Sequence, residues 1–314
     1  MALLQTLEIT SCNSCKSSRQ RPMARTRDYE SRCCDNEFEF VECEDCGLVY
    51  MKNRPDESAL DIIYSGEVSN YYDYNEYLGP VISRLRGIVQ RMKMRPFEAA
   101  ADGSVIVDVG CANGELLRIL KKYGNPSWRL VGVDLAAESM ANLAKHGIEG
   151  RRERFEKMSW SGKAPSVIVM NQVIEHLDDP RAAVEKAYEI LEPGGVLMIE
   201  TPSVEGWDAK LFRERYWGGY HTPRHWHLYK EDTLRDLLRG PGFSIVETTY
   251  LLSAYTWLHS FRFTLGDKYE AKRVSEWFQP NVFVPLSVVC ALDVLQKAVR
   301  GKTSNMRMVG RKPA

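Results

Sequence analysis

Two pairs of cysteines near the N-terminus have the spacing of a metal site. Cys12 and Cys15 form one C-x2-C pair, and Cys43 and Cys46 form the other. Four thiolates at about 2.3 Å satisfy the tetrahedral preference of Zn2+, and the metal replaces the core that so small a module lacks. The pattern predicts a structural zinc site. Disulfides, which a reducing compartment disfavours, and free buried thiols are the alternatives.

Cys33 and Cys34 belong to the same segment, since six of the eight cysteines lie within the first 46 residues. Adjacent side chains do not both point comfortably into one tetrahedron, so we interpret these two as bystanders between the pairs. Substitution of one of them for a ligand is the alternative.

A second chemical feature is the turn in "VIVDVGCANGELLRIL", residues 105 to 120. A dinucleotide-binding turn has the spacing G-x-G-x-x-G, which lets its amides approach a pyrophosphate, and this turn lacks it. Asp108 precedes Gly110 and Gly114. A carboxylate there repels phosphate but suits a cofactor that bears an ammonium and a sulfonium. Asp134, after the next strand, is placed to accept hydrogen bonds from both ribose hydroxyls.

The histidines are the third feature, because three of the six fall in "YHTPRHWH" and another follows "NQVIE". With an unperturbed pKa of about 6.5, histidine is the natural base for a hydroxyl acceptor at neutral pH. The candidate catalytic residues are His176, His225, His221 and Tyr220. Two structural roles are the alternatives: Glu175 and His176 capping the next helix, and His225 bonding the loop backbone.

Two further interpretations of the histidine segment are possible. Arg224 either pairs with a phosphate of a nucleotide sugar or forms a surface ion pair. A metal site formed by His221, His225 and His227 is disfavoured, because the segment supplies no fourth ligand.

These side chains need a scaffold, and from residue 104 apolar strands alternate with amphipathic helices. The strands "SVIVDVG", "RLVGVDL", "SVIVMNQ" and "GVLMIET" predict a doubly wound α/β fold. Ligands of such sheets bind at the carboxyl ends of the strands. Asn171 and Gln172 end the third of these strands, so we expect them at the same edge as Asp108 and Asp134.

The motifs "VDVGCANG", "GVDLA", "NQVIEHLDDP" and "LEPGGVLMIETP" resemble, in that order, those of class I S-adenosylmethionine-dependent methyltransferases, over roughly residues 100 to 252. The resemblance implies a Rossmann-like, seven-stranded, mostly parallel sheet in the order 3-2-1-4-5-7-6, with S-adenosyl-L-methionine as cofactor. The cofactor-binding residues it implies are Asp108, Gly110, Cys111, Ala112, Gly114, Asp134, Leu135, Asn171 and Gln172. Ala112 departs from the commonest, all-glycine loop.

Two other segments resemble sugar and glycan methyltransferases. "SCNSC" and "FVECEDCGLVYMKNRP" are similar to their zinc-binding segment, and "HTPRHWHLYKEDTLRDLL" with "PGFSIVETTY" is similar to their PRH segment, helix and sixth strand. The resemblance implies O-methylation of a sugar, glycan precursor or related small metabolite, with a sugar or nucleotide sugar as acceptor. C-methylation of a nucleotide-linked keto-sugar stays open, because its enolate-forming base would come from the same cluster.

The sequence predicts five parts: a zinc-ribbon module (1–54), a linker and helical lid (55–100), the methyltransferase core (101–252), a helical insert (253–304) and a final core strand (305–314). In the lid, a tyrosine cluster either packs or closes over a ligand. Its members are Tyr64, Tyr71, Tyr72, Tyr74 and Tyr77. Aromatic residues of the insert either pack together or stack on the acceptor.

Charge and composition limit the partners. Formal net charge is zero, so no bulk field attracts nucleic acid. A zinc-ribbon methyltransferase that acts on a nucleobase is therefore a disfavoured alternative. No aromatic platform interleaves with the basic stretch "RQRPMARTR", and "NQVI" stands where base-flipping enzymes have an N-P-P-Y-type tetrapeptide.

Targeting signals are the last consideration. "MALLQTLEITSC" lacks the features of a secretion signal, which predicts a cytoplasmic protein. The apolar stretch of residues 282 to 299 is interrupted by Pro285, Asp293 and Gln296. We expect a buried helix there and no transmembrane span. A helix lying on a membrane surface is the alternative, which Arg300 and Lys302 favour.

Overall fold

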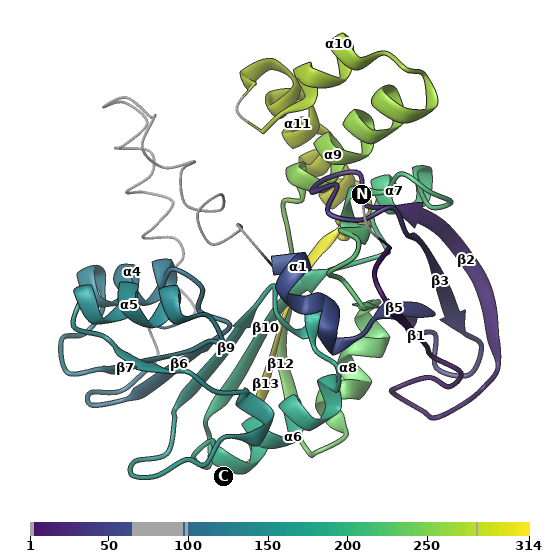
Figure 1. Ribbon diagram of the computed structural model, residues 1–314. Coiled ribbons are helices and arrows are strands. Elements are labelled where there is room, and N and C mark those ends of the chain that lie inside the picture. Colours follow the sequence, from purple (N-terminus) through teal and green to yellow (C-terminus); the bar gives the residue numbers. More distant parts are fainter. Residues whose placement is uncertain (1–2, 65–96, 98–99, 281) are drawn as a thin grey trace.

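The main element of the molecule is a seven-stranded sheet, seen in a computed structural model that describes residues 3–64, 97, 100–280 and 282–314 (Figure 1). The strand order is β12-β13-β10-β9-β6-β7-β8, which confirms the predicted order. β13 runs antiparallel to both of its neighbours, β10 and β12, and the other pairs of neighbouring strands are parallel. The strands are β6 (Val105–Val109), β7 (Arg129–Val133), β8 (Glu149–Arg151), β9 (Val167–Asn171), β10 (Val196–Pro202), β12 (Ser244–Leu251) and β13 (Asn305–Arg311).

Helices cover both faces of this sheet, because its central strands are apolar on both sides. Val105 and Val107 belong to a buried cluster with α6 and α8, whereas Ile106 packs with α4 and α5. These helices are α4 (Glu115–Tyr123), α5 (Ala137–Lys145), α6 (Pro180–Ile190) and α8 (Glu231–Arg239). The short 3-10 helices η4 (Phe155–Lys157), η5 (Ile174–His176) and η6 (Gly218–Tyr220) lie in the connections.

The start of α6 settles one alternative about the histidine segment. The Asp179 carboxylate accepts a hydrogen bond from the Ala182 amide at 3.1 Å and thereby caps the helix. Glu175 and His176 lie instead in η5, so the interpretation of these two residues as helix caps is wrong. Their side chains are available for another role.

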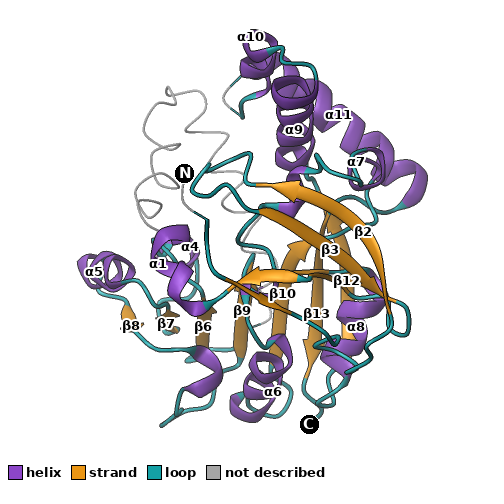
Figure 2. Ribbon diagram, turned by 45° about the vertical axis from the view of Figure 1, so that its right-hand side comes forward, coloured by secondary structure: helices purple, strands orange, loops and turns teal. Residues whose placement is uncertain are grey.

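The N-terminal residues form two smaller sheets beside the main one (Figure 2). β1 (Thr6–Glu8) pairs with β5 (Asn53–Pro55). β2 (Gln20–Arg27), β3 (Glu37–Cys43) and β4 (Val49–Met51) form an antiparallel sheet whose fourth strand, β11 (His227–Leu228), comes from the histidine segment. The N-terminal module is therefore completed by residues of the core.

Several contacts fasten the module to the core. The Met51 amide donates to the Trp226 carbonyl at 2.9 Å. The Arg54 guanidinium lies 4.6 Å above the Trp226 ring and forms an ion pair with Asp178. These contacts hold the N-terminal module against the core, and the histidine segment lies at the contact between the two.

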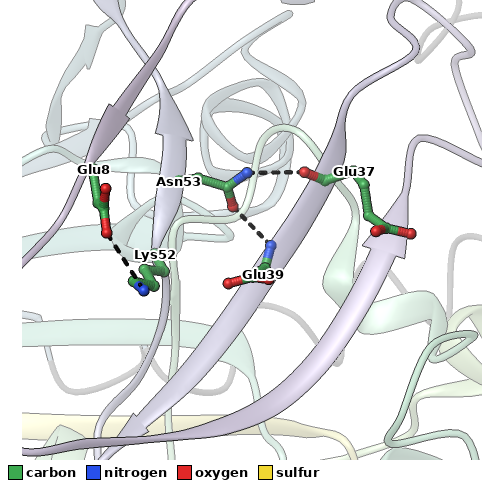
Figure 3. A pocket seen from close by; sticks show the side chains of 5 residues that line it. All are labelled: Glu8, Glu37, Glu39, Lys52 and Asn53. Carbon is green, nitrogen blue, oxygen red and sulfur yellow. Dashed lines mark hydrogen bonds and ion pairs between the residues drawn. The ribbon is translucent and has the colours of Figure 1, made fainter.

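A hollow of about 220 Å3 opens on the module itself (Figure 3). Within it, Asn53 accepts a hydrogen bond from the Glu39 amide at 2.7 Å and donates one to the Glu37 carbonyl at 2.8 Å. Lys52 forms an ion pair with Glu8 at 3.4 Å. These polar groups bond to each other and hold β1, β3 and β5 together. We therefore assign the residues that line the hollow a structural role.

The C-terminal helices lie between β12 and β13 and form one end of the molecule in both views (Figures 1 and 2). They are α9 (Ala254–Phe263), the π-helix η7 (Thr264–Lys268), α10 (Lys272–Ser275), η8 (Glu276–Phe278) and α11 (Phe283–Arg300). Buried Asp208, in α7 (Trp207–Leu211), anchors them by accepting from Trp217 Nε1 at 2.9 Å and Thr256 Oγ1 at 2.6 Å.

The expectation that residues 282–299 form a buried helix is wrong about burial. The described side chains that α11 buries are those of Pro285, Val289, Asp293 and Gln296. Asp293 accepts from Trp257 Nε1 at 2.9 Å, and Gln296 accepts from the Trp207 amide at 3.1 Å. The polar residues that interrupt the stretch therefore face the protein, and its apolar residues face outward.

Among the described residues, no single helix has both the length and the apolar character needed to cross a membrane. Lys272–Phe278 and Phe283–Arg300, bent by 62° relative to each other, meet that test together by length and composition.

Most of the expected lid, including Tyr71, Tyr72, Tyr74 and Tyr77, lies outside the described residues. The first, described residues of the expected lid form η1 (Glu57–Ala59) and α1 (Leu60–Tyr64).

Candidate functional site

The turn after β6 is fastened to the end of β7 by its own backbone. The amides of Gly110 and Cys111 donate to the Val133 carbonyl at 2.8 and 3.2 Å. Gly110, Ala112 and Gly114 have φ angles of 63°, 47° and 72°, in the left-handed region that favours glycine. Gly114 then stands as the N-cap of α4.

Two of these positions also lack space for a side chain. A Cβ on Gly110 would lie 2.5 Å from Val173 Cγ2, and one on Gly114 would lie 2.5 Å from Leu143 Cδ2. Val173 immediately precedes η5, so the turn touches the backbone that leads to Glu175 and His176. The close approach explains why the sequence has glycine at both positions.

Two carboxylates flank the turn. Asp134 accepts a hydrogen bond from the Ala112 amide at 2.8 Å and another from the Ala136 amide at 2.9 Å. Asp108 is only 4% exposed. Burial raises the pKa of Asp108 to about 8, and the nearby charge of Asp134 adds to this rise. A cation bound beside Asp108 would restore the ionised form.

The remaining predicted cofactor-binding residues border this turn or end the neighbouring strand. Cys111 is buried, whereas Leu135, after Asp134, has 53% of its surface exposed. Asn171 and Gln172 are exposed at the end of β9. Gln172 donates through Nε2 to the Asn305 side chain at 3.1 Å.

A cluster of histidines lies at the same edge of the sheet. The rings of His176 and His225 have centroids 4.7 Å apart, and those of His221 and His225 are 4.8 Å apart. His176 Nδ1 lies 3.1 Å from the Arg224 carbonyl, and His225 Nδ1 lies 2.9 Å from the Gly219 carbonyl. Since a carbonyl only accepts, each Nδ1 carries the hydrogen and each Nε2 keeps its lone pair.

Glu175 is the fourth titratable residue of this cluster. It is fully buried, and its Oε2 accepts from Thr201 Oγ1 at 2.9 Å. Its Oε1 lies 3.9 Å from His225 Nε2 and has no hydrogen-bond partner among the described residues. Burial raises the pKa of Glu175 to about 8, and burial lowers that of His176 to about 3 and that of His225 well below its usual value.

The N-terminal module reaches into this cluster through Glu30, a residue that sequence reasoning missed. Its carboxylate lies 2.7 Å from His221 Nδ1 and 3.8 Å from His259 Nδ1. It also accepts from the Tyr255 hydroxyl of α9. Although burial opposes ionisation, the charge of His221 lowers the pKa of Glu30 overall. No sequence motif marks Glu30, because its three partners come from distant segments.

The other candidates from the same segment have different surroundings. The buried Tyr220 hydroxyl donates to the Arg213 carbonyl, and its ring packs against Phe40 at 4.7 Å. His227 is separate from the cluster, with Nε2 3.1 Å from the Asn13 side chain. Among the described residues, Glu175, His176 and His225 form a set whose ligand atoms lie within 4.8 Å of one another; His221, His225 and His227 do not.

Arg224 is buried, which contradicts the interpretation of it as a surface ion pair. Its Nη2 donates to the Ile63 carbonyl of α1 at 3.0 Å. Tyr64 follows on the same helix, and its hydroxyl lies 3.3 Å from His176 Nδ1. The segment just before the undescribed residues therefore forms part of the wall of the histidine cluster.

The four predicted cysteine ligands come together in the module. Cys12 Sγ lies 3.5 Å from Cys46 Sγ, and Cys15 Sγ lies 3.5 Å from Cys43 Sγ. All four sulfurs lie within 4.8 Å of one another. Bonds of about 2.3 Å in a tetrahedron put the sulfurs about 3.8 Å apart, so the set fits a zinc ion closely.

Each pair of cysteines sits in a tight turn of the same form. The Lys16 amide donates to the Cys12 carbonyl at 2.9 Å, and the Gly47 amide donates to the Cys43 carbonyl at 2.9 Å. Cys33 and Cys34 form a separate group with Asp28, whose carboxylate accepts from the Cys33 amide at 2.7 Å. The two neighbouring cysteines are thus held apart from the four-sulfur set.

Comparison with known protein families gives one extended match. A model described as a methyltransferase domain matches residues 77–248, which is more than half of the chain.

Curated relatives match about half of the chain at low identity. A ubiquinone biosynthesis O-methyltransferase of Chelativorans sp. is 30% identical over 166 residues, which make up 49% of this chain and 63% of the relative. One of Mesorhizobium japonicum is 28% identical over 167 residues, 49% of this chain and 64% of the relative. The chain thus spans less than two thirds of the length of either relative.

Solved structures show the same fold. A phosphoethanolamine N-methyltransferase 2 of Haemonchus contortus, in complex with S-adenosyl-L-methionine, matches with a TM-score of 0.52 at 16% identity. The match covers 94% of this chain and 69% of that one. At this identity the likeness concerns the fold alone.

Proposed function

Because this chain belongs to the class I S-adenosylmethionine-dependent methyltransferases, we propose that it transfers a methyl group to a hydroxyl oxygen of a small acceptor, and that a histidine of the buried cluster takes the proton. The observation that carries the proposal is the arrangement of His176, His225 and Glu175 beside the glycine turn. The relatives' description as O-methyltransferases supports oxygen as the acceptor atom.

The turn and its carboxylates would hold the cofactor. Asp134, already oriented by the Ala112 and Ala136 amides, has lone pairs left for two ribose hydroxyls. Asp108 would pair with the cofactor ammonium, and the exposed Leu135 side chain would cover an apolar face of the nucleoside. Asn171 and Gln172 border the same edge. The bound cofactor supplies an activated methyl group, which needs alignment more than covalent help.

His176 is the better placed proton acceptor. It is partly exposed, whereas only 6% of His225 is exposed, so an acceptor reaches His176 first. Its bond to the Arg224 carbonyl fixes the tautomer and leaves Nε2 free to accept. The lowered pKa keeps this imidazole neutral across the physiological range but also makes it a weaker base, so proton transfer to it depends on neighbours that stabilise the imidazolium.

Glu175 and His225 stabilise the proton once it has moved. With its pKa raised to about 8, Glu175 is mostly protonated near pH 7. An imidazolium nearby lowers that pKa, so Glu175 releases its own proton to solvent and its carboxylate then stabilises the imidazolium. His225 lies between the two groups, 4.7 Å from the His176 ring and 3.9 Å from Glu175. His221 and Tyr220 then act as positioning residues, since His221 is held by Glu30 and Tyr220 by Arg213.

We propose structural roles for the module and for the zinc ion that Cys12, Cys15, Cys43 and Cys46 would bind. The four thiolates fill a tetrahedral coordination shell and leave no position for an acceptor. The module's contribution to the site is the wall formed by Glu30 and by the pairing of β4 with β11.

The acceptor class we propose is a sugar, a nucleotide sugar or a related small metabolite. The cysteine module, which resembles the zinc-binding segment of sugar and glycan methyltransferases, supports this choice. Arg224, buried beside the cluster, gives this side of the site a positive charge, which favours an anionic acceptor group.

The test is methyl transfer from labelled cofactor to a panel of nucleotide sugars, free sugars and catechols, with the product's methylated atom assigned by NMR. Transfer to a sugar oxygen supports the whole proposal. Transfer to a catechol oxygen overturns the acceptor class but retains the histidine base. Transfer to carbon, or binding of NAD in place of S-adenosylhomocysteine, overturns the proposed reaction.

A further inference from the structure

Helix α11 exposes a broad apolar face. Six large side chains on it are between 52% and 78% exposed: Phe283, Val284, Val288, Val294, Leu295 and Val299. The exposed residues between them are small, namely Ser287, Ala291 and Ala298. At 100° per residue, these nine positions occupy one continuous arc of roughly 160° around the helix. We call this arc the α11 face.

The α11 face is larger than the scattered exposed apolar residues that any surface carries. Large contiguous apolar patches on a protein surface generally mark an interaction site. Four turns of a helix without a single exposed acidic side chain form such a patch. Trp277, which is 68% exposed, precedes the helix and adds an aromatic side chain of the kind that favours membrane interfaces.

Positive charge flanks this face. Residues 253–304 contain seven lysines and arginines and four aspartates and glutamates, in a chain whose formal net charge is zero. One of the acids, Asp293, is buried, and another, Asp267, accepts from the Tyr216 hydroxyl at 2.7 Å. On α11 itself, the exposed cations are Lys297 and Arg300, both in its last turn and outside the arc; the Lys297 ammonium donates to the Tyr250 carbonyl at 2.5 Å.

A hollow of about 460 Å3 lies at the basic end of α11. Its lining combines the apolar side chains of Trp207, Leu211 and Trp257 with the cations Lys210 and Arg300. An apolar floor with a cationic rim matches an amphiphile that has a hydrocarbon part and an anionic head.

We propose that the α11 face docks on the surface of an anionic phospholipid bilayer, with the helix lying in the plane of the interface. The apolar arc enters the boundary between headgroups and acyl chains, and the net positive charge of the insert attracts the anionic lipid headgroups. Among the described residues, the C-terminal helices form one end of the molecule, so the described sheets leave this approach open (Figures 1 and 2). The inference holds for any acceptor of the enzyme.

A second copy of the chain fits the face less well. Two inserts of equal positive charge repel each other, whereas an anionic bilayer attracts both. The apolar arc also carries no charged side chain that would fix the register of a partner helix. Charge complementarity therefore favours lipid over self-association.

The test is sedimentation of the full chain with vesicles of phosphatidylcholine alone or with one third phosphatidylglycerol. We expect binding to the mixed vesicles, weaker binding to the neutral ones, and release as salt rises. Val288→Glu/Leu295→Glu should weaken binding at least tenfold, because it places two charges in the arc. Lys297→Gln/Arg300→Gln should weaken it about tenfold on the mixed vesicles only.

The matched control is Val246→Glu, which adds a charge at a half-exposed valine of β12, outside the insert. It should bind vesicles like the wild type. Equal affinity for S-adenosylhomocysteine in all variants shows that they are folded. Absence of vesicle binding by the wild type, or undiminished binding by Val288→Glu/Leu295→Glu, overturns the proposal. A wild-type dimer in light scattering that this double variant converts to a monomer assigns the face to a second copy instead.

Discussion

The glycine turn and the histidine cluster lie at the same edge of the sheet but are built in opposite ways. The turn takes its shape from residues close in sequence: left-handed backbone at three positions and amide bonds to the end of the next strand. The cluster takes its shape from distant segments, namely η5, the loop before β11, α1 and Glu30 of the N-terminal module. One half of the site is local and the other is assembled.

This difference has a functional consequence. In the local half, a substitution that does not displace Val173 should act on the cofactor alone. In the assembled half, a change far from the chemistry should reach the acceptor side, because the module supplies both the β4 partner of β11 and the Glu30 partner of His221. Val173 is a contact between the halves, since it touches Gly110 and precedes η5.

Loss of the proposed zinc site should have the largest effect. A structural zinc ion contributes about 10–16 kcal/mol to the folding of a small module, so Cys43→Ser should unfold the wall that carries Glu30. We expect turnover to fall by more than about a thousandfold, which is the range of losing the base and its positioning together. Steady-state methyl transfer and zinc content by mass spectrometry measure it.

Cys33→Ser is the matched control, because Cys33 lies in the same module but outside the four-sulfur set. It should keep both zinc and turnover. Affinity for S-adenosylhomocysteine, measured by calorimetry, should stay within about twofold in Cys43→Ser if the two halves are independent. Equal loss of affinity and turnover would show that the module supports the whole fold and that the two halves of the site are not independent.

Removal of the proton acceptor comes next. His176→Ala should lower kcat by about 10²–10⁴, the usual contribution of a general base, while cofactor affinity stays unchanged. Glu175→Gln keeps the shape and the bond to Thr201 but cannot ionise, so it should cause a smaller fall in kcat. Rapid-quench measurement of a single turnover separates this step from product release.

His146→Ala controls for loss of any histidine, since His146 is exposed at the end of α5. It should behave like the wild type. Unchanged kcat in His176→Ala would transfer the role to His225, and unchanged kcat in both variants would remove the histidine base from the mechanism.

Substitutions of the two glycines should have intermediate effects and separate the halves most directly. A Cβ at Gly114 meets only Leu143 of α5, and the left-handed backbone costs about 1–2 kcal/mol with any L-residue. Gly114→Ala should therefore weaken cofactor binding about tenfold and leave kcat unchanged at saturating cofactor. Gly110→Ala should lower kcat as well, since its Cβ displaces Val173.

A second substitution, at Val173, should restore the kcat that Gly110→Ala loses. Val173→Ala in the Gly110→Ala background removes the Cγ2 atom that lies 2.5 Å from the added Cβ. It should restore kcat but not cofactor affinity, which calorimetry and steady-state kinetics measure separately. If rescue is absent, the strain of Gly110→Ala is in the backbone and not at Val173.

The two halves also differ in how far the sequence predicts them. Strand order and the location of the turn follow from local patterns: apolar runs buried on both faces, and glycine at the two left-handed positions of the turn where a Cβ has no room. The four-cysteine set follows from spacing in the same way. Each of these features depends on residues near one another in the chain, so their types alone carry the information.

The assembled half required contacts that no spacing encodes. Sequence reasoning named His176, His221 and His225 but not Glu30. It left His227 out of the catalytic set, and His227 lies beside Asn13. It also expected a buried helix at residues 282–299, and the helix is present but most of its apolar side chains are exposed. The buried side carries Asp293 and Gln296, which bond to Trp257 of α9 and Trp207 of α7, and hydropathy cannot reveal such partners.

The smallest expected effect is a proton released on cofactor binding, and it belongs to the local half alone. With its pKa raised to about 8, Asp108 carries a proton at pH 7, whereas pairing with an ammonium requires the carboxylate. Binding should therefore release close to one proton at pH 7. The affinity should rise about tenfold per pH unit below pH 8 and level off above it, because one pKa unit is 1.36 kcal/mol.

Calorimetry in two buffers of different ionisation enthalpy measures this proton, and Asp108→Asn should abolish it. Asp102→Asn, at an exposed carboxyl just before β6, should retain it. Glu175→Gln should also retain the proton release. The pKa of the Glu175 carboxyl is similarly raised, but we place Glu175 beside the acceptor's proton and not beside the cofactor ammonium. A proton lost in Glu175→Gln and kept in Asp108→Asn would show that the cofactor binds across the assembled half, which would reverse the roles of the two regions.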